Sequence, residues 1–553
     1  MSDDSDDTVA LSFDPAQVEV WRHLLASVAE EMGVALERTA YSPNIKERFD
    51  HSCALFDAEG RLLAQAAHIP VHLGAMPLML ATLRAHVPWH PGDMWLCNDP
   101  RYGGTHLPDL TLVAPVFHDG ELLGFVASRA HHADIGGMAP GSLPLSTELC
   151  QEGLILPPVR LVCAGQVQED IVQILCANSR TPAERRGDLA AQVAANETGT
   201  RRLRALVERY GRDEFRRRTV ENIAYAAEAV RRALHALPEG VYAARDFLDD
   251  DGLDARDILI AVTVTVDGGM KRRITFDFTG SAPQVRGPLN ATEAITRSAC
   301  YYVVRCLVPQ EVPTNAGCFE PITVVAPEGT VVNARFPAAV AGGNVETSQR
   351  IVDVVLRALA LAAPDRVPAA SQGTMNNVTI GGYDPVHRRS FAYYETLGGG
   401  AGGAPAGDGA HAIHTHMTNT RNTPVETLES HYPLRVRAYR IADGTGGAGV
   451  HRGGDGLVRE IELLVPCTIS LLTERRRHPP YGLNAAPGAP GKQWLTWPDG
   501  TRQDLPGKWS GYCPAHTVLT VQTPGGGGWS PVMQADSVDA AAETGETEEC
   551  PAR

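Results

Sequence analysis

Hydrophobic residues recur at helical spacing near the start of the chain and alternate with polar residues in many later segments. The first helical stretch begins at Asp14 and Pro15, a capping carboxylate followed by a first-turn proline. Its apolar positions lie three or four residues apart, as on one face of a helix: Val18, Trp21, Leu25, Val28 and Met32. We therefore predict that an amphipathic helix follows Asp14.

Further helices are expected in the middle of the chain. Two long amphipathic helices are predicted at about 184–237, with a break near Gly211 and an end at Pro238. Helical spacing returns at about 292–308 and 344–362. The chain thus alternates helical segments with stretches of a different periodicity.

Short strands and glycine turns account for most of the remaining sequence. Residues 44–165 are interpreted as strands with tight turns, and 258–266 and 273–278 have the two-residue alternation of strands. Residues 430–530 are predicted to be all-β, with strands between glycine-rich turns such as RGGDG and PGGGG. Together these patterns predict an α+β fold that is multi-lobed and β-rich with helical segments.

The length of the chain predicts more than one domain. At 553 residues it exceeds the size at which one hydrophobic core normally stops growing. The two ends are acidic and poor in apolar residues, a composition typical of disorder. We expect the following division: a disordered N-terminus at 1–12, a metal-site domain at 13–240 with the helical segment 184–237, an α+β middle domain at 241–429, a β-rich C-terminal domain at 430–531, and a disordered tail at 532–553.

The balance of charged and apolar residues excludes several kinds of protein. A formal net charge of −16 argues against a nucleic-acid partner, because no net basic surface exists. No apolar run reaches the length of about 18 residues that a membrane span needs. Eleven cysteines without a Cys-x-x-Cys pair, and an N-terminus without an apolar signal segment, favour a reduced, cytoplasmic protein.

Histidine and aspartate gather in two short segments, GGTHLPDLTL (103–112) and SRAHHADIGGMAPGS (128–142). Five side chains there are candidates for metal binding: His106, Asp109, His131, His132 and Asp134. Imidazole nitrogens and carboxylate oxygens hold divalent ions such as Zn²⁺, Mn²⁺ or Fe²⁺. Each segment adjoins a strand-like run, so a hairpin would bring the side chains to one ion. The alternative is that they are turn caps and buried imidazoles without an ion.

A glycine-rich segment at 397–409 contains Gly-x-Gly-x-x-Gly but does not predict a nucleotide site. The dinucleotide fingerprint needs a helix directly after the glycines, and Ala-Pro-Ala-Gly follows here instead. No P-loop motif occurs either, so we expect no ATP-binding residues in this chain. We interpret the segment as a permissive loop between strands, with backbone contact to a substrate as the alternative.

Beyond the two histidine segments, many longer blocks occur in one order and resemble the hydantoinase B/oxoprolinase family. The resemblance extends from about Phe13 to about Pro531. Its blocks include NIKERFDHSCALFD (44–57), NDPRYGGTHLPD (98–109), RAHHADIGGMAPGS (129–142), GGNVETSQR (342–350), YETLGGGAGG (394–403) and HRGGDGLVRE (451–460).

The resemblance implies one half of a two-component, ATP-dependent enzyme. An A-type (hydantoinase A-like) partner would bind ATP and phosphorylate the carbonyl oxygen of a cyclic amide, and this chain would carry a divalent metal and complete the hydrolysis. The implied ligands are Asp50, His106, Asp109 and His131, and either Zn²⁺ or Mn²⁺ suits them. His132 and Asp134 would then act in catalysis by orienting a ligand or moving a proton, and His72 is a weaker candidate for that role.

Three functions remain open at this level. The leading one is a hydrolase subunit that opens hydantoin, 5-oxoproline or lactam rings, of the N-methylhydantoinase or 5-oxoprolinase type. The second is a subunit of an ATP-dependent carboxylase that acts on a ketone such as acetone or acetophenone. The third is a scaffold that uses the ion only to fold. The sequence identifies no substrate-binding residues.

Overall fold

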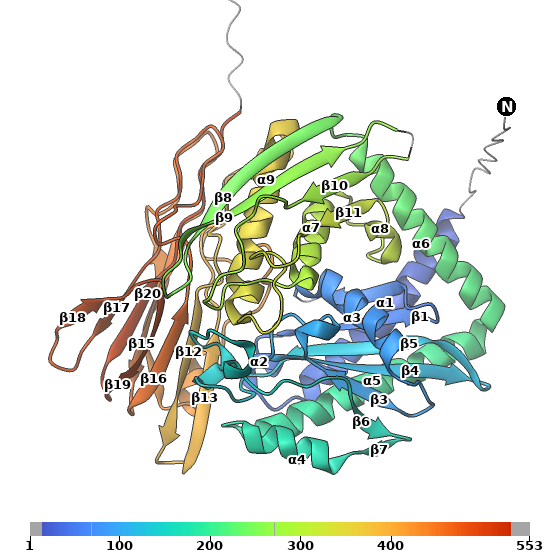
Figure 1. The fold of residues 1–553 in the computed structure, drawn as a ribbon, viewed down its shortest axis with the longest axis horizontal. Helices are drawn as coiled ribbons and strands as arrows, with labels where there is room; N and C mark the ends of the chain where they lie inside the picture. Colours follow the sequence, from blue (N-terminus) through green and yellow to red (C-terminus); the bar gives the residue numbers. More distant parts are fainter. Residues whose placement is uncertain (1–13, 68, 270, 532–553) are drawn as a thin grey trace, which may run out of the picture.

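The structure, a computed structural model, describes residues 14–67, 69–269 and 271–531 and combines four β-sheets with helices packed on and between them (Figure 1). This is the mixed α+β, sheet-rich architecture that the sequence predicts. The acidic ends at 1–12 and 532–553, for which disorder is predicted, lie outside the described residues.

The first sheet has seven antiparallel strands and carries most of the histidine and aspartate cluster. Residues of β1 alternate between two hydrophobic cores: Cys53 and Leu55 face one, Ala54 and Phe56 the other. Both faces are therefore buried. In spatial order the strands are β2 (Leu62–Ala67), β1 (His51–Asp57), β5 (Glu121–His131), β4 (Asp109–His118), β3 (Met94–Cys97), β6 (Val159–Cys163) and β7 (Gln166–Val167).

Helices cover both faces of this sheet. The expected first helix is present as α1, capped by the side chain of Asp14, which accepts from the amides of Ala16 and Gln17. The two predicted long helices are also present, and Gly211 separates them. α1 and α5 pack together on one face, and α3 lies on the other. The bounds are α1 (Pro15–Thr39), α2 (Pro43–Lys46), α3 (His72–His86), α4 (Glu169–Asn178), α5 (Pro182–Tyr210) and α6 (Arg212–Leu234).

A second, four-stranded sheet and its helices follow, drawn green to yellow in Figure 1. Along β9, buried and half-buried residues alternate as predicted for 258–266. The helix predicted at 344–362 begins with one π turn (Gly343–Thr347) and continues as α9. The bounds are β8 (Gly240–Asp250), β9 (Arg256–Val266), β10 (Ile274–Asp277), β11 (Ile322–Val325), α7 (Glu293–Leu307), α8 (Ala316–Phe319) and α9 (Ser348–Ala362).

Two further sheets share one hydrophobic core in the C-terminal part, drawn orange to red. One has the order β13 (Arg389–Glu395), β12 (Asn377–Asp384), β16 (Cys467–Leu472) and β19 (Lys508–Cys513). After α10 (Val425–His431), the other has the order β14 (Leu434–Ala442), β15 (Gly456–Leu463), β20 (Val518–Gln522), β17 (Lys492–Thr496) and β18 (Arg502–Asp504). Strands from both sides of residue 430 thus pair in one sheet, and the domain division given above stays a prediction.

Three glycine-rich segments, 398–403, 446–454 and 525–528, pack against one another without intervening side chains. The amide of Gly526 donates to the carbonyl of Gly454 (2.9 Å), and the amide of Gly454 donates to that of Ala401 (2.8 Å). A Cβ on Gly526 would lie 1.9 Å from the oxygen of Ala401. Residues 397–409 form a loop, as expected, but it is not a permissive one. Gly400, Gly403 and Gly409 lie against neighbouring backbone, and their amides bond to the chain itself. We call the three segments the glycine layer.

Neither a disulfide nor a membrane-spanning helix is found in the described part of the chain. Its ten cysteines are all free thiols. Its helices lack the combination of length and apolar character that crossing a bilayer requires.

Candidate metal centre

The β4–β5 hairpin brings two of the predicted ligands face to face. Asp109, the first residue of β4, is paired in register with His131, the last residue of β5. His106 lies three residues before Asp109, in the turn that enters β4. The hairpin expected from the sequence is therefore confirmed, and its open end holds these three side chains together.

Three atoms of this group are nearly equidistant. His106 Nε2 lies 3.1 Å from Asp109 Oδ1, and His131 Nδ1 lies 3.2 Å from each of them. Metal–ligand bonds of about 2.0–2.1 Å give ligand–ligand distances of about 3.3 Å in a tetrahedron and about 2.9 Å in an octahedron. The three residues are at most 2% exposed. The group therefore has the spacing and the burial of a site that could hold a metal ion.

The electrostatics of the group also favour a cation. Burial, the largest single cause, lowers the pKa of His106, but Asp109, the carbonyl of Ala341 and the charge of Asp50 together raise it by more, so the net direction is upward. Burial raises the pKa of Asp109, yet the charge and hydrogen bonds of His106, with those of His131 and His72, hold it well below its usual range. The N–H at Nδ1 of His106 donates to the carbonyl of Ala341 (3.3 Å), which in the neutral ring leaves the lone pair of Nε2 facing the group.

Neighbouring side chains fix the orientation of Asp109. The hydroxyl of Thr105 donates to its Oδ2 (2.7 Å), and Nε2 of His72, at the start of α3, lies 3.6 Å from the same oxygen. Nδ1 of His72 lies 2.9 Å from the hydroxyl of Ser52. His72 thus lies directly behind the candidate ligand Asp109. The sequence had made His72 only a weak candidate for orienting a ligand or moving a proton.

Asp50 is close to the group without belonging to the set of three. It directly precedes β1, and its carbonyl accepts a hydrogen bond from the amide of His131 (3.0 Å). Its charge contributes to raising the pKa of His106, so its carboxylate lies within electrostatic range. Its assignment as a fourth ligand stays a prediction.

His132 and Asp134 make contacts outside the group. Nε2 of His132 lies 2.9 Å from Oε1 of Gln192 on α5, and burial, with the charge of Arg185, lowers the pKa of His132 to about 4. Asp134 accepts hydrogen bonds from backbone amides of its own turn and from the guanidinium of Arg180 (3.0 Å). Both side chains anchor the strand end and turn that carry His131, and their catalytic roles stay predictions.

Two residues that sequence reasoning gave no role contact the ligands directly. Nδ2 of Asn344, in the π turn, lies 3.1 Å from Nε2 of His106. The ring of Tyr394 stacks on His131 with centroids 4.7 Å apart, and Arg48 donates to its carbonyl (2.8 Å). Asn344 and Tyr394 belong to blocks that carry the family resemblance, GGNVETSQR and YETLGGGAGG, and this was the one signal that could have singled them out.

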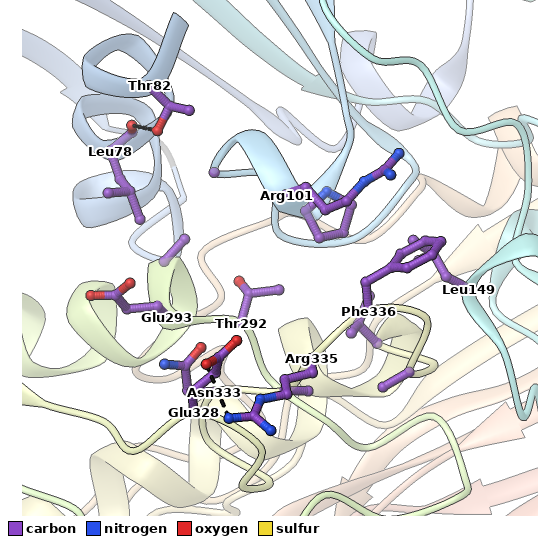
Figure 2. Close-up of a pocket in the computed structure, with 16 residues that line it drawn as sticks. Leu78, Thr82, Arg101, Leu149, Thr292, Glu293, Glu328, Asn333, Arg335 and Phe336 are labelled. Carbon is purple, nitrogen blue, oxygen red and sulfur yellow. Dashed lines mark hydrogen bonds and ion pairs between the residues drawn. The ribbon is translucent and has the colours of Figure 1, made fainter. Parts of the chain in front are cut away.

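A cavity of about 380 Å³ is lined by residues of α3, the turn after β3, the start of α7 and the segment 328–340. Figure 2 shows Arg101 and Phe336 side by side at its edge, where the guanidinium stands 4.6 Å from the ring centroid. Val340 lines the cavity, and the next residue, Ala341, binds His106. The lining of the cavity is therefore adjacent in sequence to a residue that binds the metal group.

Comparison with known proteins places this chain in a family. The chain matches the hydantoinase B/oxoprolinase family over residues 14–532, and it belongs to that family. It is 40% identical to 5-oxoprolinase 1 of Arabidopsis thaliana over 93% of this chain and 42% of that protein. It is 34% identical to a putative D-/L-hydantoinase subunit of Pseudomonas sp. strain NS671, over 85% of this chain and 82% of the relative. The chain thus spans less than half the length of the 5-oxoprolinases that it matches.

Two solved structures have the same fold. The ATP-dependent caprolactamase of Pseudomonas jessenii superimposes with a TM-score of 0.87 at 30% identity, over 94% of this chain and 91% of that one. An acetone carboxylase superimposes with a TM-score of 0.84, over 94% of this chain and 76% of that one. Its identity is 18%, so this second likeness shows the fold alone.

Proposed function

We propose that this chain is the metal-bearing component of an ATP-dependent hydrolase that opens cyclic amides. The observation that carries the proposal is the buried convergence of His106, Asp109 and His131. The caprolactamase and the 5-oxoprolinases among its relatives support the substrate class, a ring that contains an amide bond. The relative that is named as one subunit of a hydantoinase supports a heteromer, with an A-type partner that binds ATP.

A cyclic amide resists water because resonance stabilises its carbonyl group, so the partner is proposed to phosphorylate the carbonyl oxygen first. His106, Asp109 and His131, with Asp50 as the proposed fourth ligand, would hold Zn²⁺ or Mn²⁺ in this chain. A bound ion of this kind supplies hydroxide near neutral pH and polarises oxygen.

The residues around the group have roles of their own. The carbonyl of Ala341 keeps the proton of His106 on Nδ1, and Thr105 holds Asp109 in place. His132 and Asp134 are proposed to keep the strand end at His131 in position and to take part in proton movement. Burial of the group excludes bulk water.

Carboxylation is the competing function, and the proposal favours hydrolysis over it. The relatives named for amide-ring hydrolysis have 30–40% identity to this chain, whereas the carboxylase has 18%. With an A-type partner and ATP, the hydrolase should turn over hydantoin, 5-oxoproline or a lactam without added bicarbonate. A strict requirement for bicarbonate would overturn the proposal in favour of carboxylation.

Metal content is the first measurement to make. Mass spectrometry on the purified chain should find near-stoichiometric Zn²⁺ or Mn²⁺, and the folded variants His106→Ala and Asp109→Ala should lose it. His235→Ala is a matched control, because this exposed histidine at the end of α6 lies outside the group. A parent protein without metal, or variants with full metal, would refute the proposed site.

A further inference from the structure

The π turn at Gly343–Thr347 holds one side chain directly against the metal group. All five residues of the turn are buried. The amide of Gly343 donates to the carbonyl of Pro288 (3.1 Å), and a Cβ on Gly343 would lie 1.9 Å from the carbonyl oxygen of Asn290. The turn is therefore fixed against its neighbours. A π turn changes the direction of side chains relative to a regular helix, and such turns are frequent at functional sites.

The side-chain amide of Asn344, on this turn, has a paired nitrogen and an unpaired oxygen. Its Nδ2 lies 3.1 Å from Nε2 of His106, the same atom that lies 3.1 Å from Asp109 Oδ1. Its Oδ1 is buried and has no hydrogen-bond partner among the described residues. The side chain is 4% exposed, so water does not readily replace the missing partner. A buried carbonyl oxygen without a partner is unfavourable, so the observed orientation of the amide has a cost.

A bound cation would reverse which end of the amide is favoured beside Nε2 of His106. Without an ion, an amide N–H is the group that best satisfies the lone pair of Nε2. A half-turn of the amide exchanges nitrogen and oxygen with almost no change of shape. When the lone pair of Nε2 binds a cation, the N–H of Asn344 has no acceptor there. The amide oxygen is then favoured on that side, because an amide oxygen can itself bind a metal ion.

We propose that Asn344 is a further metal ligand, which binds the ion through Oδ1. This inference rests on the proposed function, since it takes the His106 group to hold a divalent ion. Oxygen donors of this kind suit Mn²⁺, which accepts more ligands, better than Zn²⁺, which is commonly complete with four. The amide of Asn344 therefore adds more to the affinity for Mn²⁺ than to that for Zn²⁺.

The test is a metal titration of the full chain. After removal of bound metal, the affinities for Mn²⁺ and Zn²⁺ alone are measured by competition with a chelator. Asn344→Ala should weaken Mn²⁺ binding at least about tenfold and Zn²⁺ binding clearly less. Asn344→Asp, which keeps the shape and supplies an oxygen, should bind both ions at least as tightly as the parent. If the alanine variant does not fold, the affinities of Asn344→Asp test the proposal in its place.

A control variant separates a ligand from general packing. Thr347→Val changes the same turn, but this hydroxyl donates to the carbonyl of Leu289 and does not face the group. It should leave both affinities unchanged. Parent-like affinity in Asn344→Ala, or equal losses for the two ions, would overturn the inference. A parent chain that binds neither ion would instead refute the proposed function.

Discussion

Replacing Gly526 with alanine should destabilise the C-terminal part of the molecule, because the glycine layer has no room for a methyl group. The new Cβ would lie 1.9 Å from the carbonyl oxygen and 2.3 Å from the carbonyl carbon of Ala401. Carbon atoms in favourable contact are about 3.5–4.0 Å apart. Both neighbours are backbone atoms, so no side-chain rotation can relieve the clash, and the two segments must separate by more than about 1 Å.

The cost of this separation can be worked out from the contacts that it breaks. Gly526 donates to Gly454 (2.9 Å), and Gly454 donates to Ala401 (2.8 Å). An overpacked position costs about 1–3 kcal/mol, and each buried hydrogen-bonding group left without a partner costs about 1–3 kcal/mol. We expect Gly526→Ala to lower the free energy of unfolding by about 4 kcal/mol.

Urea unfolding, with hydrogen exchange of the glycine layer, measures this effect. Gly269→Ala is the matched control: nothing lies within 4 Å of its added Cβ, and its φ lies outside the left-handed region. That change should be neutral or stabilise by up to about 1 kcal/mol. The close-packing argument is refuted if the free energy of unfolding of Gly526→Ala lies within about 1 kcal/mol of that of the control and its amides exchange no faster.

Three other changes have expected outcomes. Burial raises the pKa of Glu346 to about 8, so between its unfolded value of 4.5 and that pH the folded chain keeps a proton that the unfolded chain releases. Stability should therefore fall as pH rises through this window, by at most about 1.4 kcal/mol per pH unit, and Glu346→Gln should flatten the slope in urea titrations at several pH values. Arg475→Ala would leave the buried carboxylates of Asp246 and Asp353 with the longer contacts to Arg350. It should cost about 3 kcal/mol in the same assay; a loss below about 1 kcal/mol would contradict this. Chelation of the ion should lower the unfolding free energy by about 2.7 kcal/mol relative to a sample at 100 times its Kd, and Asp109→Ala should show no response to the chelator.

The part of the site carried by adjacent strands was predictable. Alternating residues on both sides of a short turn predict a hairpin, and a hairpin places Asp109 opposite His131. His106 follows because it lies only three residues away in the same turn. Local periodicity brought these three side chains together, since the elements that carry them are neighbours in sequence. Their choice as ligands over His132 and Asp134 came from the family resemblance.

Contacts between distant segments could not be predicted in this way. Asn344 and Tyr394 are more than 200 residues from the ligands that they touch, and no periodic pattern links them. A π turn has no recognisable signature in GNVET. The glycines at 397–409 predicted a turn-rich segment correctly, but their packing against 525–528 depends on a partner that composition does not reveal.

The strand order of the sheet that contains β12 has a consequence for synthesis of the chain. β12 and β13 are made before α10, β14 and β15, yet the open edge of β12 is covered only by β16, at residues 467–472. Until then the nascent chain exposes an unpaired strand edge, which is prone to aggregation. Tyr394 lies in β13 and stacks on His131. The contact of Tyr394 with the metal group therefore becomes stable only late in translation, well after the histidines and Asp109 have been synthesised.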